Sequence, residues 1–304
     1  MGRDSYRLNS NIFLAINYRL KIIMKKLMTL LFVLVFAGST AFAQNNDATV
    51  DQIGYDNDAE VEQIGLDNEV TLEQVHNHLL GTRGINDADV KQTGNTNIAD
   101  IYQRNRGQYA ASGFNNNLDL IQDGNLNTAI TYQAIARGND IKLDQFGDGN
   151  FADIYQHQGG KLSGYGSASR TVQDGEGNEL YIDMGNFNDA GITQDGNFNL
   201  ADIKQNSFSS DNVQLMQEGD DHEVLLIQSE GMADIRQFGG NNNYVYGLVG
   251  SGTFAHQEGG SIMTVIQNGS LNELFIGQEA AGTATVTQMG DNNTSTIEQG
   301  LGGS

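Results

Sequence analysis

The side chains that could bind a metal ion lie in short polar segments of the chain. Asp123-Gly-Asn125-Leu-Asn127 and Asp195-Gly-Asn197-Phe-Asn199 each place several oxygen ligands in one turn, as calcium-binding loops do. Neither segment contains the Gly-Gly-x-Gly-x-Asp pattern of calcium-binding β-rolls, and Asp-Gly-Asn is also ordinary turn chemistry. His76-Asn-His78 brings two imidazoles together in a chain that has no cysteine. The sequence therefore predicts no metal site and no cofactor, and it leaves calcium binding as an alternative.

Paired carboxylates could support glycoside chemistry, and β-helical proteins do include polysaccharide-active enzymes. The acids of this chain recur at strand positions such as Asp100, Asp153 and Asp202 instead of gathering at one distinctive place. That distribution is typical of a solvated face. The chain also contains no phosphate-binding glycine loop, nucleophile elbow or helical zinc motif. We therefore predict that the protein is not an enzyme.

A repeated motif carries these residues and must position them. Its skeleton is Gln-x-Gly-x-x-Asn-x5-Gln, and it returns at intervals of roughly 20 to 30 residues, which is the signature of one stacked supersecondary unit. Complete copies begin at Gln52, Gln63, Gln92, Gln122, Gln145, Gln194, Gln267 and Gln288. Copies with one substitution begin at Gln173 (Met184 ends it), Gln217 (His222 replaces Asn) and Gln237 (Leu248 ends it).

Strict alternation within each copy predicts half-buried strands and leaves little room for helix. One strand reads Asn86-x-Ala88-x-Val90-x-Gln92-x-Gly94, and the next reads Asn97-x-Ala99-x-Ile101-x-Gln103. The intervening residues, such as Asp100 and Tyr102, face the other side. Each unit is then a strand, a tight Gly-x-x-Asn turn, a second strand and a looser return of variable length. The prediction is an all-β β-solenoid of about ten turns with amyloid-like cross-β stacking, in which Gln52 begins an extra half-turn.

The polar residues of the motif are predicted to form a structural ladder along the solenoid. A buried amide without a partner costs about 1–3 kcal/mol, and amides stacked at one position in successive turns can donate on one side and accept on the other. The predicted ladder residues are Gln52, Gly54, Asn57, Gln63, Gly65, Asn68, Gln74, Gln92, Gly94, Asn97, Gln103, Gln122, Gly124, Asn127, Gln133, Gln145, Gly147, Asn150, Gln156, Gln173, Gly175, Asn178, Gln194, Gly196, Asn199, Gln205, Gln217, Gly219, Gln228, Gln237, Gly239, Gln267, Gly269, Asn272, Gln278, Gln288, Gly290, Asn293 and Gln299.

The composition agrees with a chain whose segments nearly all donate ladder hydrogen bonds. The 304 residues include no proline, whereas an ordinary chain contains about 5%. Proline cannot donate a backbone hydrogen bond, so its absence fits a sheet throughout. The absence of cysteine excludes a disulfide framework and any thiolate metal site.

The N-terminal region has the features of a secretory signal peptide. Met24-Lys-Lys begins a basic segment, an apolar run follows, and Ala41-Phe-Ala43 predicts cleavage before Gln44. An N-terminal anchor helix is the alternative. Residues 1–23 are predicted to be an upstream extension before a start at Met24, or else an unusually long signal n-region. The predicted division is 1–43 for these segments and 44–304 for the repeat solenoid.

Cleavage there leaves 10 basic and 37 acidic residues, a net charge of −27 against −22 for the whole chain. Such a surface repels nucleic acid and anionic lipid and slows self-association. Residues 44–304 contain no further apolar stretch of membrane length, so we predict no integral membrane segment in the mature chain.

The form Gln-x-Gly-x-x-Asn-x-Ala-x3-Gln, found at residues 92–103, 145–156 and 194–205, resembles the curlin repeat of bacterial curli subunits. The resemblance covers residues 46–299. It implies a secreted functional amyloid, exported unfolded through a curli-type outer-membrane pore and assembled with itself and other curli-like subunits. The implied location is extracellular fibres at the bacterial surface, which serve adhesion and the biofilm matrix.

The chain departs from the curlin pattern in two respects. Where curlin repeats often begin with Ser, this chain more often has Asn or Asp, as at Asn86, Asn139, Asn188 and Asp211. Its return loops are long and uneven, so its role as main subunit, nucleator or minor subunit stays open. The alternative function is a monomeric β-solenoid adhesin or calcium-dependent surface protein, and a polysaccharide-active enzyme is a third hypothesis.

Overall fold

The computed structural model describes residues 43–54, 56–78, 84–107, 114–134, 139–157, 168–184, 188–205, 211–228, 231–248, 261–278 and 283–299. The chain divides into two units, Met1–Gln44 and Asn45–Ser304, and the fold below is that of the second. Except for Ala43, the predicted upstream extension and signal peptide lie outside the described residues. Within the ranges given above, no helix is long and apolar enough to cross a membrane.

The strands form two parallel sheets, and the chain passes from one sheet to the other at every turn. A short strand, β1 (Ala43–Gln44), precedes them. The first sheet contains, in spatial and chain order, β3 (Asn57–Leu66), β5 (Gly84–Asn95), β7 (Phe114–Asp123), β9 (Asn139–Phe146), β11 (Ala168–Asp174), β13 (Asn188–Asp195), β15 (Asp211–Asp220), β17 (Gly231–Asn241), β19 (Ser261–Asn268) and β21 (Thr283–Met289).

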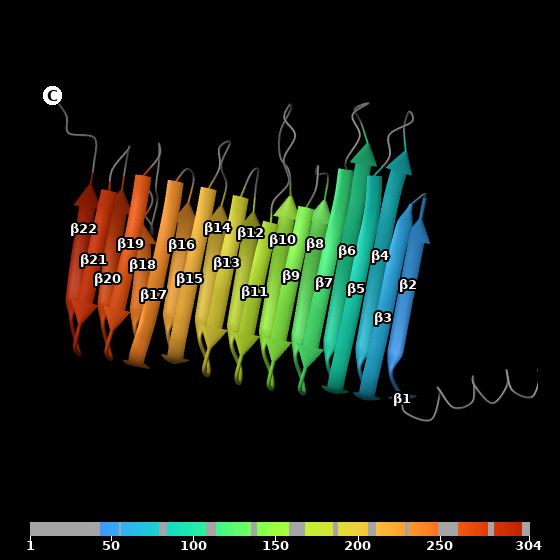
Figure 1. Ribbon diagram of the computed structural model, residues 1–304, viewed down its shortest axis with the longest axis horizontal. Coiled ribbons are helices and arrows are strands. Elements are labelled where there is room, and N and C mark those ends of the chain that lie inside the picture. The colour runs from blue at the N-terminus through green and yellow to red at the C-terminus, as the bar shows by residue number, and fades with distance from the viewer. Residues whose placement is uncertain are drawn as a thin grey trace, which may run out of the picture. The chain divides into compact units, whose positions relative to one another are not determined.

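The second sheet contains the even-numbered strands, also in chain order. They are β2 (Asp47–Ile53), β4 (Glu69–His78), β6 (Ile98–Gly107), β8 (Thr128–Ala134), β10 (Phe151–His157), β12 (Glu179–Met184), β14 (Leu200–Gln205), β16 (Glu223–Gln228), β18 (Tyr244–Leu248), β20 (Glu273–Gln278) and β22 (Thr294–Gln299). Figure 1 shows the two sheets lying against each other, with their strands pointing in opposite directions. This is a β-solenoid, and the prediction of an all-β fold is confirmed.

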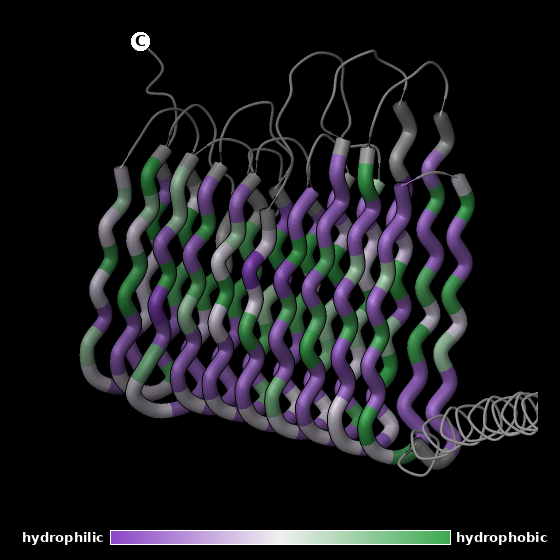
Figure 2. The backbone as a smooth tube through the Cα atoms, turned by 45° about the vertical axis from the view of Figure 1, so that its right-hand side comes forward, coloured by the Kyte–Doolittle hydropathy of each residue, from purple (hydrophilic) through white to green (hydrophobic). Residues whose placement is uncertain are grey.

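Parallel register places equivalent motif residues in columns along each sheet. In the first sheet Ala59 pairs with Ala88, and Gln63 pairs with Gln92. The strand sequences explain the register, because a slip of one residue would turn every buried side chain outward. Figure 2 shows the resulting alternation of polar and apolar residues along the strands.

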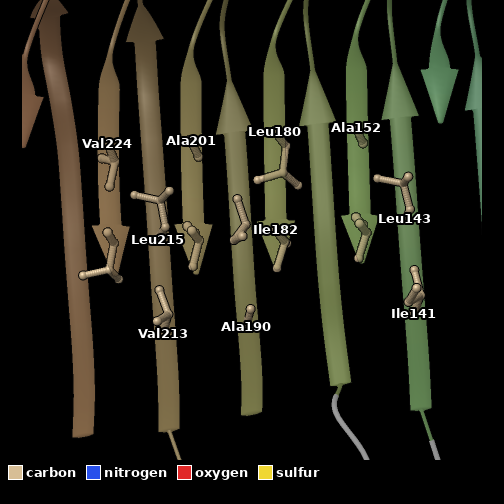
Figure 3. Packing of buried hydrophobic residues seen from close by; sticks show 14 of the residues in the cluster. Ile141, Leu143, Ala152, Leu180, Ile182, Ala190, Ala201, Val213, Leu215 and Val224 are labelled. Carbon is tan, nitrogen blue, oxygen red and sulfur yellow. The ribbon is translucent and has the colours of Figure 1, made fainter. Parts of the chain in front are cut away.

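The apolar core is a thin layer between the two sheets. Figure 3 shows Ile141 and Leu143 of one sheet and Ala152 and Leu180 of the other, and all four side chains are buried. Burying each large aliphatic side chain contributes about 1.5–3 kcal/mol. Along a strand the two inward apolar positions differ in size, as Ala152 and Ile154 do on β10, and both side chains are fully buried.

The tight turns depend on glycine. Gly94 and Gly124 have φ values of 110° and 137°, which an L-residue rarely adopts. A Cβ atom added to either glycine would collide with the backbone carbonyl of the glycine in the next turn. The turn glycines therefore stack more closely than any other residue allows. This glycine column consists of Gly65, Gly94, Gly124, Gly147, Gly175, Gly196, Gly219, Gly240, Gly269 and Gly290.

The copy of the motif that begins at Gln237 departs from the spacing expected from the sequence. Gly240, not the predicted Gly239, occupies the glycine column, because a register shift between Glu218 and Asp220 accompanies one extra residue in β17. The same extra residue places Asn243 in the turn column, and Leu248 pairs with Gly277 instead of with a glutamine.

The copy beginning at Gln52 lies in the second sheet, where Gln52 pairs with Gln74, so β2 forms the extra half-turn. Its Gly54 approaches the His76 backbone, and its Asn57 pairs with Asn86 at the start of β5. Gly54 and Asn57 therefore lie outside the columns of turn glycines and turn asparagines, although their residue types match the motif.

Candidate functional site

The glutamines of the first sheet form a continuous hydrogen-bonded column. The Nε2 atom of each glutamine donates to the Oε1 atom of the glutamine in the next turn, at distances from 2.7 to 3.0 Å. Register alone brings these side chains together, because every strand carries Gln at the same pleat position. The column contains Gln63, Gln92, Gln122, Gln145, Gln173, Gln194, Gln217, Gln237, Gln267 and Gln288.

The second amide hydrogen of these glutamines ties one sheet to the other. Gln92 Nε2 donates to the Glu69 carbonyl at 3.1 Å, and Gln145 Nε2 donates to the Thr128 carbonyl at 3.1 Å. Both acceptors lie on strands of the facing sheet. Because the side-chain oxygen accepts from the previous turn, each interior amide is fully hydrogen-bonded although it is buried.

A shorter column is described in the second sheet. Gln52, Gln74, Gln103 and Gln133 each donate to the next glutamine, the last of them to Gln156, at 2.8, 2.8, 2.8 and 3.4 Å. Beyond this point the register aligns Met184, Gln205 and Gln228 with that column, and further along aligns Gln278 with Gln299. The side chains of Met184, Gln205, Gln228, Gln278 and Gln299 lie outside the described part of the structure.

The turn asparagines form a third column that runs through both side chain and main chain. The Asn97 backbone N–H donates to Asn68 Oδ1 at 3.0 Å, and Asn97 Nδ2 donates to the Gly124 carbonyl at 2.9 Å. One asparagine therefore joins three successive turns. The column contains Asn46, Asn68, Asn97, Asn127, Asn150, Asn178, Asn199, His222, Asn243, Asn272 and Asn293.

His222 replaces asparagine in this column and preserves its continuity. Its backbone N–H donates to Asn199 Oδ1 at 3.0 Å, and its Nδ1 accepts from the Asn243 backbone N–H at 3.2 Å. These bonds assign the ring proton to Nε2, which lies 3.3 Å from the Glu218 carbonyl. Burial lowers the pKa of His222, although the Glu218 carbonyl, Asp220 and Asp221 act in the opposite direction. The neutral ring is thus the form that the turn requires.

Acidification should therefore destabilise the turn at His222. A lowered pKa means that the folded chain binds fewer protons than the unfolded chain, so the free energy of unfolding falls once the pH drops below the ordinary value of 6.5. We expect the denaturation midpoint to be lower at pH 5.5 than at pH 7.5. In His222→Asn this difference should shrink, because asparagine fills the same place without titrating. An equal pH dependence in both proteins would contradict this role.

An additional polar column on the outside of the turns is not part of the predicted ladder. Asn125 donates from both its backbone N and its Nδ2 to Asp148 Oδ1, at 2.7 and 2.9 Å. Asn197 makes the same pair of bonds to Asp220, both at 2.9 Å. The sequence signal was an Asn or Asp directly after the turn glycine. These are the segments considered above as calcium loops, and their amides are engaged in bonds between turns.

The other candidate metal and acid residues are dispersed. His76 is buried, and the His78 side chain lies outside the described residues. Along the outer face of the second sheet, Ile130 separates Asp100 from Asp153, and Tyr181 separates Asp153 from Asp202. Among the side chains that the structure describes, no group of three or more His, Cys, Asp or Glu residues is placed to hold a metal ion.

Comparison with known families agrees with this geometry. The model of the curlin associated repeat matches residues 43–75 and 113–147. These stretches include the copies that begin at Gln52, Gln63 and Gln122. Neither the curated proteins nor the solved structures yield a match to the chain. The matched repeats and the β-solenoid fold point to a structural protein and not to an enzyme.

Proposed function

Because the chain contains curlin associated repeats, we propose that it is a curli-type structural subunit that is secreted and assembles into extracellular amyloid-like fibres. The fibres would serve adhesion and the biofilm matrix at the bacterial surface. The observation that carries this proposal is the continuous glutamine column from Gln63 to Gln288, since every rung is the same and a further turn could extend it.

The column has a direction, which favours head-to-tail growth. Every glutamine donates toward the C-terminal end of the stack and accepts from the N-terminal side. At the C-terminal end, the acceptors of Gln288 among the described residues belong to its own and the preceding turn, namely the Glu273 and Asn293 carbonyls and the Ser295 hydroxyl. A second copy that stacks on this end would repeat the bonds found inside the chain. Such a heterologous contact, repeated along the axis of the stack without closing into a ring, generates an open filament.

The edge strands β21 and β22 support the same mode of growth. Each lies at the edge of its sheet, and an edge strand presents backbone N–H and C=O groups that can pair with an incoming strand. Among the described residues, no atom lies within 4 Å of a Cβ atom added to Gly290, whereas one added to Gly269 would collide with the Gly290 carbonyl. The glycine column is thus open to a further turn at Gly290.

The acidic surface would restrain premature assembly. The chain has a net charge of −22, and neighbouring strands place Asp58 beside Asp87. Burial raises the pKa of Asp87, and the neighbouring carboxylates of Asp58 and Asp89 raise it further. Mutual repulsion keeps unassembled chains apart, and acidic side chains act as gatekeepers against aggregation. Export in the unfolded state through a curli-type pore, and assembly with other curli-like subunits, belong to the same proposal.

Electron microscopy and sedimentation of residues 44–304, diluted from denaturant into neutral buffer, test the proposal. We expect unbranched fibres that sediment and that seed assembly of fresh protein. Discrete rods that stay in the supernatant and do not seed would contradict it. That result would favour a monomeric β-solenoid adhesin whose ends do not accept a further strand.

A further inference from the structure

A hollow lies on the outer face of the first sheet, over the consecutive strands β11, β13, β15 and β17 (Figure 1). Along these strands, buried residues such as Ile192 and Leu215 alternate with residues that face outward. The outward residues that give the hollow its chemistry are Arg170, Gly191, Thr193, Gln214, Asp234 and Arg236. Because this face is lateral, a further turn stacked on the edge strands leaves the hollow uncovered.

The centre of the hollow is a missing side chain at Gly191. The register pairs Arg170 with Gly191 and Gly191 with Gln214. Strands about 4.8 Å apart therefore place Arg170 and Gln214 about 10 Å from each other, with no side chain between them. Gln214 Nε2 lies 3.7 Å from the place that a Cβ atom of residue 191 would take, so this amide borders the gap. The space suits one small polar group.

Neither backbone conformation nor packing requires glycine at residue 191. Gly191 does not have the positive φ of the turn glycines. A Cβ atom added there would meet the Gln214 amide only at an ordinary contact distance, whereas one added to Gly175 or Gly196 would collide with backbone. Glycine within a strand weakens it, and it often marks a place where a ligand approaches closely. The gap is therefore the feature that distinguishes Gly191 from the glycine column.

The hollow also contains an arginine without an ion-pair partner. Arg170 is exposed, and no ion pair of its guanidinium group is found among the described residues. Every other basic residue on the strands of the first sheet has a carboxylate partner: Lys91 with Glu62, Lys142 with Asp119 and Asp144, and Arg236 with Asp234. In a chain with a net charge of −22, an unpaired cation beside a gap is a candidate anion site.

The charges around the hollow favour a ligand with one negative charge. Two hydrogen bonds, of 3.0 and 2.9 Å, hold the Arg236 guanidinium group against the Asp234 carboxylate. Arg170 and Arg236 against Asp234 leave an excess of one positive charge. The next outward positions on β11, β13 and β15 are acidic, namely Asp174, Asp195 and Glu218. These carboxylates would repel a polyanion but leave room for a single carboxylate.

We propose that this hollow binds a sugar acid, whose carboxylate lies over Gly191 and pairs with Arg170. A guanidinium group matches a planar carboxylate, to which it donates two parallel hydrogen bonds. The Thr193 hydroxyl and the Gln214 amide have no hydrogen bond to any described residue, so both can pair with the hydroxyl groups of a sugar. The proposal does not depend on fibre assembly.

Equilibrium dialysis of the full chain against labelled glucuronate, at neutral pH and low salt, tests the proposal. We expect saturation at one glucuronate per chain. Glucuronamide has nearly the same shape without the charge, and it should bind at least about five-fold more weakly because it loses the ion pair with Arg170. Equal binding of glucuronate and glucuronamide would overturn the proposal.

Variants on the outer face locate the site without disturbing the core. Arg170→Gln should weaken glucuronate binding about five-fold or more. Gly191→Val should abolish binding by filling the gap, while the denaturation midpoint stays at least as high, because a β-branched residue suits a strand better than glycine. The matched control is Lys91→Gln, which removes a cation from β5 on the same face and should leave binding unchanged.

Two outcomes with these variants would contradict the site. Equal losses in Arg170→Gln and Lys91→Gln would show that general surface charge holds the anion. Unchanged binding in a folded Gly191→Val would show that the gap is not where glucuronate lies.

Competing carboxylates identify the class of ligand. Acetate has the charge without the hydroxyl groups, and N-acetylglutamate methylamide represents an acidic side chain of a partner protein. We expect both compounds to displace glucuronate only at concentrations about five-fold higher or more, because neither forms the sugar's bonds to Thr193 and Gln214. Displacement by acetate at equal concentration would reduce the hollow to a general anion site. Stronger displacement by the glutamate compound would assign it to a protein partner, and either result would overturn the sugar acid as ligand.

Discussion

Gly147→Ala is expected to lower the free energy of unfolding by about 3–5 kcal/mol, among the largest effects of any single substitution in this chain. Gly147 has a φ of 93°, and a Cβ atom at this position would collide with the backbone carbonyl of Gly175 in the next turn. Backbone atoms cannot move aside as a flexible side chain can. The turns must therefore separate, which breaks the hydrogen bonds that continue the ladder on both sides.

Gly149→Ala is the matched control in the same turn. Gly149 also has a positive φ, of 68°, but no atom of the described residues lies within 4 Å of a Cβ atom added there. Its substitution should cost only about 1–2 kcal/mol, the strain of the left-handed conformation. Chemical denaturation of both variants measures the difference. Equal losses in the two variants would show that the strained conformation matters and that close stacking of the glycine column does not.

The double substitution Gln145→Ala and Asn150→Ala should have the second large effect. Gln145 accepts from Gln122 at 2.9 Å and donates to Gln173 at 2.8 Å, so its removal leaves both neighbours with an unsatisfied buried group. Asn150 accepts from the Asn178 backbone N–H at 3.1 Å and donates to the Gly175 carbonyl at 3.0 Å. With about 1–3 kcal/mol for each orphaned buried group, the loss of stability should reach about 4–6 kcal/mol.

We expect the same double variant to assemble more slowly, with a longer lag and a lower fibre yield, because two rungs of the template are missing. Gln214→Ala is a suitable control, since Gln214 is an exposed amide on the outer face of β15. That variant should change stability by no more than about 0.5 kcal/mol and leave the lag unchanged. An unaltered lag time and yield in the double variant would count against the ladder as the basis of assembly.

The regular part of the fold was predictable because the alternation along each strand and the spacing between motif copies lead to the same arrangement of strands. In Asn86-x-Ala88-x-Val90-x-Gln92 the alternation determines which side chains are buried, and equal spacing in the next copy determines the register. Parallel stacking then places equal residues side by side, so the glutamine column follows directly from the sequence. The extra half-turn at Gln52 was also predictable, since its motif overlaps the copy that begins at Gln63.

Other features were not predictable, because the sequence permits more than one alignment. Gly239-Gly240 followed by three asparagines offers two equally good turns, and only the packing of Gly240 between Gly219 and Gly269 distinguishes them. The outer bonds of Asn125 to Asp148 resemble ordinary turn composition when one copy is viewed alone. The stacked rings of Tyr102, Tyr132 and Tyr155 depend on three neighbouring strands sharing one residue type on the outer face, where no burial requires it.

The measurement that tests the central claim most directly is solid-state NMR of assembled fibres in which labelled chains are diluted about ten-fold with unlabelled chains. The account predicts that side-chain amide contacts such as Gln92 Nε2 to Gln122 Oε1, 2.8 Å apart, lie within one chain. Their intensity per labelled chain should therefore survive dilution. Contacts that vanish on dilution would show that equal residues of different chains stack in register, and the solenoid with its internal ladder would be the wrong description of the fibre.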